Sequence, residues 1–321
     1  MGPQGPAGAP GVDRSPPVNN AISVIDGAGN QSVTTSITVG ADGLGLISYA
    51  DSANGDLKVA HCSNQACSTA TISTVDSVGK VGAYNSITVG TDGLGLISYS
   101  GSSSLKVAHC SNQACSSATT STVDSSGKVG DYTSITVGTD GLGLISYAGF
   151  GTLQVAHCSN QACSTATLST VDAVGNVGYS TSITIGTDGL GLISYGGLGN
   201  QVLKVAHCSD QTCSSAALST LDSVADARDS TSITVGAEGM GVISYFGTGN
   251  KVLKLAHCSD QTCSSATTST VASMVLVGGS TSITMGTDGL GLISYLDFTS
   301  PFSFKVVRCS NALCVPYFRR R

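Results

Sequence analysis

The sequence predicts an all-β fold built from a tandem repeat, and its composition, its periodicity and its turn residues all support this prediction. The 321 residues include 41 glycines, only 11% charged residues, no tryptophan and a single glutamate, Glu238. The chain is rich in glycine, serine, threonine, valine and isoleucine, which favour short strands joined by tight turns. We therefore expect strands and turns rather than a helical bundle.

One unit recurs six times along the chain. Each copy begins with Ser-Ile-Thr, at Ser36, Ser86, Ser134, Ser182, Ser232 and Ser282. In the first copy, four strand-length runs cover residues 36–40, 44–49, 57–62 and 71–76, and pairs such as Asp42-Gly43 and Asn54-Gly55 separate them. Such pairs are typical of hairpin turns. The copies lie 48 to 50 residues apart. A period of this length with four strands predicts the blade of a β-propeller.

The two ends of the repeat array predict how the ring closes. The sixth copy has no fourth run after Cys314, whereas residues 21–26, which precede the first copy, match the fourth run at residues 71–76. An N-terminal strand that completes the last blade would remove the open edges of the sheet. We therefore predict a closed six-bladed β-propeller over residues 21–318. An open β-solenoid is the alternative, but a solenoid does not need an N-terminal strand that completes its last repeat.

The first twelve residues form a separate element. Gly2, Gly5, Gly8 and Gly11 fall at every third position with prolines between them, which is the collagen Gly-X-Y pattern. This pattern predicts a piece of a longer collagen-like stalk and, through it, a homotrimer. The alternative is a disordered leader that is rich in glycine and proline by chance. Residues 13–20 are interpreted as a linker, and residues 319–321 as a short basic tail.

Six Cys-x4-Cys pairs predict one local disulfide in each blade. The pairs are Cys62 and Cys67, Cys110 and Cys115, Cys158 and Cys163, Cys208 and Cys213, Cys258 and Cys263, and Cys309 and Cys314. Cysteines that bracket a four-residue turn can reach disulfide geometry, which indicates an oxidising, extracellular setting. A metal site is the alternative, because a histidine precedes the first cysteine in five copies. However, adjacent strand residues point to opposite faces, and Arg308 replaces the histidine in the sixth copy.

The loops between the second and third runs vary in length and content, unlike the rest of the repeat. We expect these loops and the connections between blades to share one face of the disc, where diversity on a rigid scaffold can carry recognition. The candidate ligand-binding residues on this face are Tyr84, Tyr132, Phe150, Tyr179, Arg228, Phe246, Asn250, Lys251, Phe298 and Phe302. Neutral drift in exposed loops is the alternative. The lysines of the third run, such as Lys106 and Lys204, are interpreted as solvated.

Several functional classes find no support in the sequence. The net charge of −6 gives no electrostatic footprint for nucleic acid, and no apolar run is long enough for membrane insertion. Glycoside hydrolysis usually requires paired carboxylates, and Glu238 is only the fifth copy of a turn aspartate. No nucleophile elbow or phosphate-binding loop is present. We therefore expect a protein that is not an enzyme and has neither a cofactor nor a metal.

The repeat unit also resembles that of a known group of proteins. Asp-Gly-Leu-Gly-Leu-Ile-Ser-Tyr, Leu-Lys-Val-Ala-His-Cys-Ser-Asn-Gln-Ala-Cys and the ending Cys-Val-Pro-Tyr-Phe-Arg-Arg-Arg are similar to repeats of secreted bacterial proteins that often carry collagen-like segments. The resemblance implies an extracellular repeat protein and supplies no catalytic residues. The expected function is a surface-displayed adhesion module for a glycan or a cell-surface protein. A structural fibre or cap protein and a phage-type receptor-binding tip are the alternatives.

Overall fold

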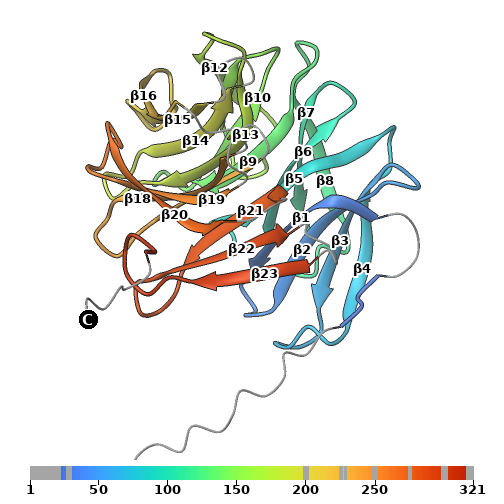
Figure 1. Ribbon diagram of the computed structural model, residues 1–321. Helices are drawn as coiled ribbons and strands as arrows, with labels where there is room; N and C mark the ends of the chain where they lie inside the picture. The colour runs from blue at the N-terminus through green and yellow to red at the C-terminus, as the bar shows by residue number, and fades with distance from the viewer. Residues whose placement is uncertain are drawn as a thin grey trace, which may run out of the picture.

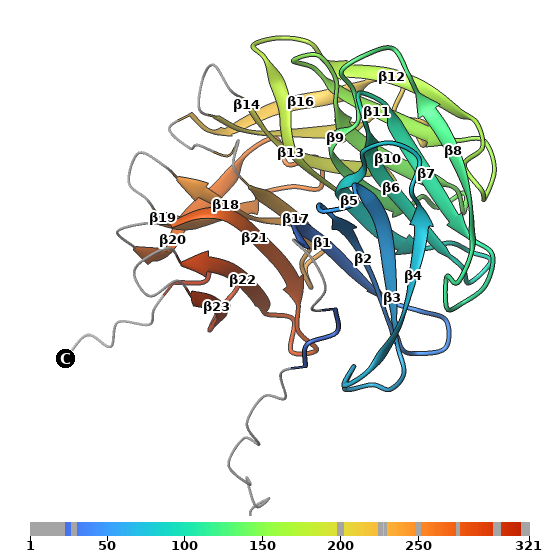
Figure 2. The same cartoon turned by 90° about the vertical axis from the view of Figure 1, so that its right-hand side faces the viewer.

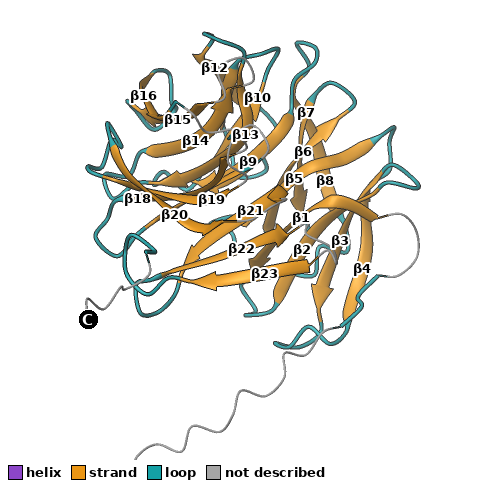
Figure 3. Ribbon diagram, viewed as in Figure 1, coloured by secondary structure: helices purple, strands orange, loops and turns teal. Residues whose placement is uncertain are grey.

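The computed structural model describes residues 23–26, 31–197, 202–223, 227, 230–247, 252–273, 277–297 and 303–315. These residues form strands, turns and loops and contain no helix (Figure 3). Six antiparallel sheets follow one another around a common centre in chain order (Figures 1 and 2). The prediction of an all-β, six-bladed propeller is therefore confirmed.

The six blades share one strand order, in which each strand pairs with its neighbour in sequence. Blade 1 consists of β1 (Gln31–Val39), β2 (Gly45–Asp51), β3 (Asp56–Cys62) and β4 (Ala70–Asp76). Blade 2 consists of β5 (Val81–Val89), β6 (Gly95–Gly101), β7 (Leu105–Cys110) and β8 (Ala118–Asp124). Blade 3 consists of β9 (Asp131–Val137), β10 (Gly143–Ala148), β11 (Leu153–Cys158) and β12 (Ala166–Asp172).

The second half of the chain repeats this order. Blade 4 consists of β13 (Val177–Ile185), β14 (Gly191–Gly197), β15 (Val202–Cys208) and β16 (Ala216–Asp222). Blade 5 consists of β17 (Thr231–Val235), β18 (Gly241–Gly247), β19 (Val252–Cys258) and β20 (Ala266–Ser273). Blade 6 consists, in its described residues, of β21 (Val277–Met285), β22 (Gly291–Asp297) and β23 (Ser303–Arg308).

The Ser-Ile-Thr strand is the innermost strand of each blade, and its serine connects the blades. The backbone N–H of Ile87 in blade 2 donates to the hydroxyl of Ser36 in blade 1 at 3.1 Å. The same bond recurs from Ile135 to Ser86, Ile183 to Ser134, Ile233 to Ser182 and Ile283 to Ser232. The serine therefore recurs because its side chain satisfies a backbone donor of the next blade.

The second strand is buried on both faces because its blade lies between two others. All seven residues of β6 are buried, in contrast to the outermost strand β8, whose residues are exposed or partly buried except for the buried Asp124 at its end. The buried Ser98 hydroxyl meets the Thr133 hydroxyl of the next blade at 2.8 Å. The buried Tyr99 hydroxyl donates to Asp76 of the preceding blade at 2.7 Å. The run Leu-Ile-Ser-Tyr is thus a two-sided core strand.

The lysine of the third strand was expected to be solvated, and this expectation is wrong. Lys204 forms an ion pair with Asp172 of the preceding blade, whose carboxylate also accepts the Tyr195 hydroxyl at 2.8 Å. Equivalent pairs join Lys106 to Asp76 and Lys254 to Asp222. The aspartate is buried, so an opposite charge reduces the cost of removing its carboxylate from water.

All six predicted disulfides are present, with Cα atoms 4.5 to 4.8 Å apart. They explain the second glycine of each Asp-Gly-Leu-Gly turn. A Cβ atom on Gly143 would lie 2.8 Å from Cys158 Sγ and 3.0 Å from Leu96 Cδ2 of the preceding blade. Only glycine leaves room for the bridge at this position. Disulfides at this density are typical of oxidising environments such as the extracellular space.

The histidine before the first cysteine makes a polar contact near the disulfide of its blade. His157 Nε2 lies 2.7 Å from Asp140 Oδ2, on the turn between the first two strands of its blade. The pairs His61 and Asp42, His109 and Asp92, and His207 and Asp188 repeat this contact. In blade 6 the substituted Arg308 binds Asp288 instead. The position is therefore a cross-strand polar contact, and arginine can replace histidine in it.

The junction between blades 6 and 1 differs from the other five. Ile37 of blade 1 is 67% exposed, whereas its equivalents in blades 2 to 6 are 6% exposed. On the other side of the junction Val306 is 54% exposed, in contrast to the buried Val59 and Val107. Asp26, which lies N-terminal to blade 1, accepts the Tyr49 hydroxyl at 2.8 Å. This repeats the contact of Asp76 with Tyr99, so Asp26 occupies the place expected for the end of the sixth blade's fourth strand.

The described residues 23–26 do not themselves form a strand, and blade 6 has three strands within the described part of the chain. The other residues of the predicted closing strand, 21–22, lie outside the described residues. The collagen-like residues 1–12, the linker 13–20 and the basic tail 319–321 also lie outside them.

The lysine–aspartate pair can be tested with a natural contrast between blades. Blade 3 has Gln154 in place of the lysine, and the facing Asp124 carboxylate accepts the Tyr147 hydroxyl. We expect Lys204→Gln to lower the free energy of unfolding by about 1 kcal/mol, because it removes a charge-assisted bond to a buried aspartate. Gln154→Lys adds such a bond to Asp124 but removes the hydrogen bonds of Gln154 with Thr152 and Thr170, so we expect it to raise the free energy of unfolding by a smaller amount. Chemical denaturation of both variants measures this. Unchanged midpoints in both would show that the pair contributes no stability.

We expect the turns between the third and fourth strands to contribute to the stability of the fold in acid. Hydrogen bonds from Ser214 and Thr212 lower the pKa of Asp210 to about 2, and Ser264 and Thr262 lower that of Asp260 to about 2. A pKa below the unfolded value stabilises the fold above about pH 4 and loses this contribution as the pH falls toward 2. We expect the double variant Asp210→Asn/Asp260→Asn to lose less stability than the wild type over this range.

Asparagine is the natural residue at this position in blades 1 to 3, so the variant retains the turn. Thermal unfolding at pH 7, 4 and 2 provides the comparison. An equal loss of stability in the wild type and the double variant would contradict the assignment.

Candidate functional site

One face of the disc carries the variable loops together with the connections between blades, as expected. The backbone N–H of Val81, which follows the connection from blade 1 to blade 2 as the first residue of β5, donates to Gly55 O in the β2–β3 loop at 2.9 Å. The N–H of Val177 donates to Gly151 O in the β10–β11 loop at 3.0 Å. Each connection is thereby fixed beside the loop of the blade that it leaves. We call this surface the loop face.

Three of the predicted ligand-binding residues form a cluster on the loop face. Tyr84, Tyr132 and Tyr179 come from the starts of β5, β9 and β13, in successive blades. The ring centroids of Tyr84 and Tyr132 are 4.5 Å apart, and those of Tyr132 and Tyr179 are 5.6 Å apart. Burial and the neighbouring Tyr84 raise the pKa of Tyr132, so its hydroxyl stays neutral at physiological pH. We call these three residues the tyrosine cluster.

Two of the three tyrosines are held in an unfavourable backbone conformation. Tyr84 and Tyr132 have φ values of 51° and 52°, in the left-handed region that bulky side chains rarely adopt. The hydroxyl of Thr133 donates to Tyr84 O at 2.8 Å, and the hydroxyl of Thr181 donates to Tyr132 O at 2.8 Å. Contacts with the next blade therefore maintain the strained backbone. Ser180, at the same position of its repeat, has a φ of 49° and accepts the hydroxyl of Thr231 at 2.8 Å, so this conformation belongs to the repeat.

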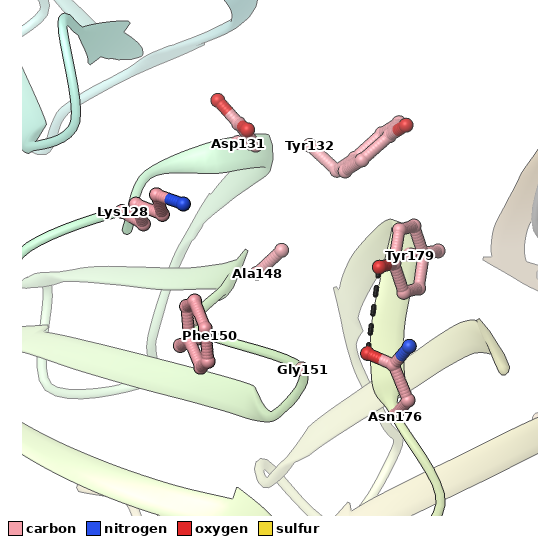
Figure 4. A pocket seen from close by; sticks show the side chains of 9 residues that line it. Lys128, Asp131, Tyr132, Ala148, Phe150, Gly151, Asn176 and Tyr179 are labelled. Carbon is pink, nitrogen blue, oxygen red and sulfur yellow. Dashed lines mark hydrogen bonds between the residues drawn. The ribbon is translucent and has the colours of Figure 1, made fainter. Parts of the chain in front are cut away.

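A pocket of about 490 Å³ opens beside the tyrosine cluster, between blades 3 and 4. Figure 4 shows Lys128, Asp131 and Phe150 on one side of it and Tyr132, Tyr179 and Asn176 on the other. Phe150 is 77% exposed, and the Lys128 ammonium lies 5.6 Å from the centroid of its ring. The pocket thus combines aromatic surfaces with a few polar and charged groups, as ligand sites commonly do.

The polar groups of the pocket have few partners within the protein. Asp131 Oδ1 accepts the Ser100 hydroxyl at 3.0 Å, and Asn176 Oδ1 accepts the Tyr179 hydroxyl at 3.4 Å. Among the described residues, neither Lys128 nor Asp131 takes part in an ion pair. Hydrogen-bonding capacity therefore remains available to a ligand.

Two of the other hollows in the described part of the chain lie at the loop face and between blades 5 and 6. One, of about 320 Å³, lies at the centre of the loop face and is lined by Tyr84 and Tyr132 together with serine, threonine and asparagine residues of all six innermost strands. It shares Tyr132 with the pocket. The other, of about 160 Å³, lies between blades 5 and 6, where Val242 replaces the leucine found at this position in the other blades.

The structure separates the predicted ligand-binding residues into three groups. Phe150, Tyr84, Tyr132 and Tyr179 lie together on the loop face. Phe246 does not: it is 2% exposed and packs between blades 5 and 6 with Leu253 and Tyr295, so its assignment to a ligand site is wrong. The remaining candidates, Arg228, Asn250, Lys251, Phe298 and Phe302, lie outside the described residues.

Sequence reasoning missed Lys128 and Asn176, which line the pocket from two different connections between blades. Both have positive φ values, 45° and 55°, and each follows a glycine at the same offset in its repeat. The residue that follows this glycine was the feature of the sequence that could have identified both side chains. The side chains become neighbours only because adjacent connections flank one β10–β11 loop.

Comparison with known proteins supports the fold and leaves the family open. Neither a protein-family model nor a curated protein matches the chain. Among solved structures, a protein of unknown function from Dyadobacter fermentans is 10% identical with a TM-score of 0.61, and the match covers 89% of this chain and 95% of that one. AofleA from Arthrobotrys oligospora is 12% identical with a TM-score of 0.56, over 86% of each chain.

The comparison also corrects the expectation that the chain is not an enzyme. An α-L-arabinofuranosidase from Fusarium graminearum, solved with an iminosugar inhibitor, is 13% identical with a TM-score of 0.60, over 87% of this chain and 93% of that one. The same fold thus carries a glycoside hydrolase. Its likeness to this chain concerns the fold alone, so the propeller architecture gives no ground for excluding catalysis.

Within the described residues, no helix has the length and apolar character that crossing a membrane requires. The described side chains also contain no group of three or more histidine, cysteine, aspartate or glutamate residues arranged to hold a metal ion.

Proposed function

We propose that the protein is an extracellular binding module that recognises a glycan through the pocket beside the tyrosine cluster. The observation that supports this most directly is the pocket itself, in which tyrosine and phenylalanine rings stand beside a lysine, an aspartate and an asparagine. Aromatic rings pack against the C–H faces of a sugar ring, while the polar groups bind its hydroxyls and set specificity. The six disulfides support an extracellular location.

A collagen-like stalk would strengthen such binding. The Gly-X-Y pattern at residues 2–11 supports a trimer in which three propellers are displayed together. Linking three weak sites raises the overall affinity when all three engage the same surface. A cell-surface glycan, which repeats along a surface, fits this arrangement.

The pocket can be tested with two variants that remove its rings. Tyr132→Gly removes one ring and also relieves the strained backbone, because glycine adopts positive φ without a steric penalty. Tyr179→Ala removes the second ring. We expect each to weaken binding to a ligand found on a glycan array by at least about tenfold, since the lost aromatic contact and buried area contribute roughly 1.5–3 kcal/mol.

Val78→Ala is the matched control, because Val78 is exposed on the loop face in a different connection and does not line the pocket. Unfolding midpoints verify that all variants are folded. A blank array, or array binding that both tyrosine variants retain, would contradict the proposal.

A further inference from the structure

The pocket has an unusual distribution of charge. Lys128 and Asp131 are its only charged lining residues, they have opposite signs, and neither is neutralised by an ion pair in the described part of the chain. At several junctions between blades the charges are paired, as in Lys106 with Asp76 and Lys204 with Asp172. A pocket that presents one charge of each sign complements a ligand that carries both.

The carboxylate of Asp131 lies near Tyr132 but on the opposite side of the pocket from the two tyrosine rings. Asp131 directly precedes Tyr132 at the start of β9, and Figure 4 shows both near the same end of the hollow. The rings of Tyr132 and Tyr179 are inclined by 58°, so they present two differently oriented faces rather than one flat platform. A quaternary ammonium group has no N–H donor, and proteins bind it with aromatic faces and negative charge. This end of the pocket meets both requirements.

N–H donors that can bind an anion come from Lys128, between β8 and β9, and from Asn176, between β12 and β13. The Lys128 ammonium carries three N–H donors beside Phe150. Because Asn176 Oδ1 accepts the Tyr179 hydroxyl, the amide nitrogen of Asn176 can offer its two N–H donors to a ligand oxygen. Both residues have positive φ. This conformation is rare for a lysine, and rare backbone conformations are found more often at binding sites.

We propose that the pocket binds a phosphocholine-type group, with the phosphate at Lys128 and Asn176 and the quaternary ammonium against Tyr132, Tyr179 and Asp131. This inference rests on the proposed function and names the chemical group that the site recognises. A glycan that carries phosphocholine and a phosphatidylcholine headgroup present the same chemistry, so the experiment includes both sources.

The test titrates the full chain, with its disulfides intact, with phosphocholine, choline and inorganic phosphate in a calorimeter. We expect saturable binding of phosphocholine. Asp131→Asn keeps an acceptor for Ser100 but removes the charge, and it should weaken phosphocholine and choline by about tenfold while leaving phosphate unchanged. Lys128→Gln should weaken phosphocholine and phosphate and leave choline unchanged. Val78→Ala should match the wild type.

Sedimentation with phosphatidylcholine vesicles and binding to a phosphocholine-bearing polysaccharide then distinguish the two sources, and binding to either supports the inference. Absence of saturable phosphocholine binding at millimolar concentrations would overturn it, as would equal effects of the two charge variants on choline and on phosphate. If array glycans bind the pocket and phosphocholine does not compete with them, this inference fails and the proposed function stands. If neither binds, both fail.

Discussion

Each apolar core cluster in the described part of the molecule lies between two blades rather than within one. In the first of them, Leu46 and Val59 of blade 1 pack against Ile87 and Tyr99 of blade 2. A single four-stranded blade has two apolar faces and cannot bury either of them alone, so the ring is the unit that folds. The polar residues of the repeat act across the same junctions. Serine hydroxyls satisfy backbone donors of the next blade, and buried aspartates hold tyrosines and lysines of the next blade.

The same junctions explain why the site lies where it does. Bonds from Thr133 and Thr181 hold the backbones of Tyr84 and Tyr132 in the left-handed region, and they thereby fix the tyrosine cluster on the loop face. The loops between the second and third strands of each blade do not pack in these junctions, and their lengths and residues differ. In blade 2 the hydroxyl of Ser102 closes the loop onto Lys80 O at 2.7 Å, whereas in blade 3 the exposed Phe150 borders the pocket. A repetitive scaffold thus produces a site that occurs once among the described blades.

The structural neighbours show how little the fold alone says about chemistry. An arabinofuranosidase and AofleA share this architecture at 13% and 12% identity. The blades of all these proteins bury apolar faces against one another around an axis. This packing does not depend on what the loops bind. The function of this chain therefore depends on the charges, rings and backbone conformations of its own loop face.

The sequence by itself determined the repeat, the four runs of each blade and the cysteine pairing, because these depend on period, turn residues and contacts within one hairpin. It also identified the tyrosines and Phe150 as candidates. It misjudged Lys204, which pairs with Asp172 thirty-two residues earlier, and Phe246, which packs between blades 5 and 6. Only the tertiary structure decided these contacts and brought Lys128 and Asn176 to one pocket. The physical reason is that alternation along a strand tells which side a residue faces, whereas the neighbouring blade decides what it meets there.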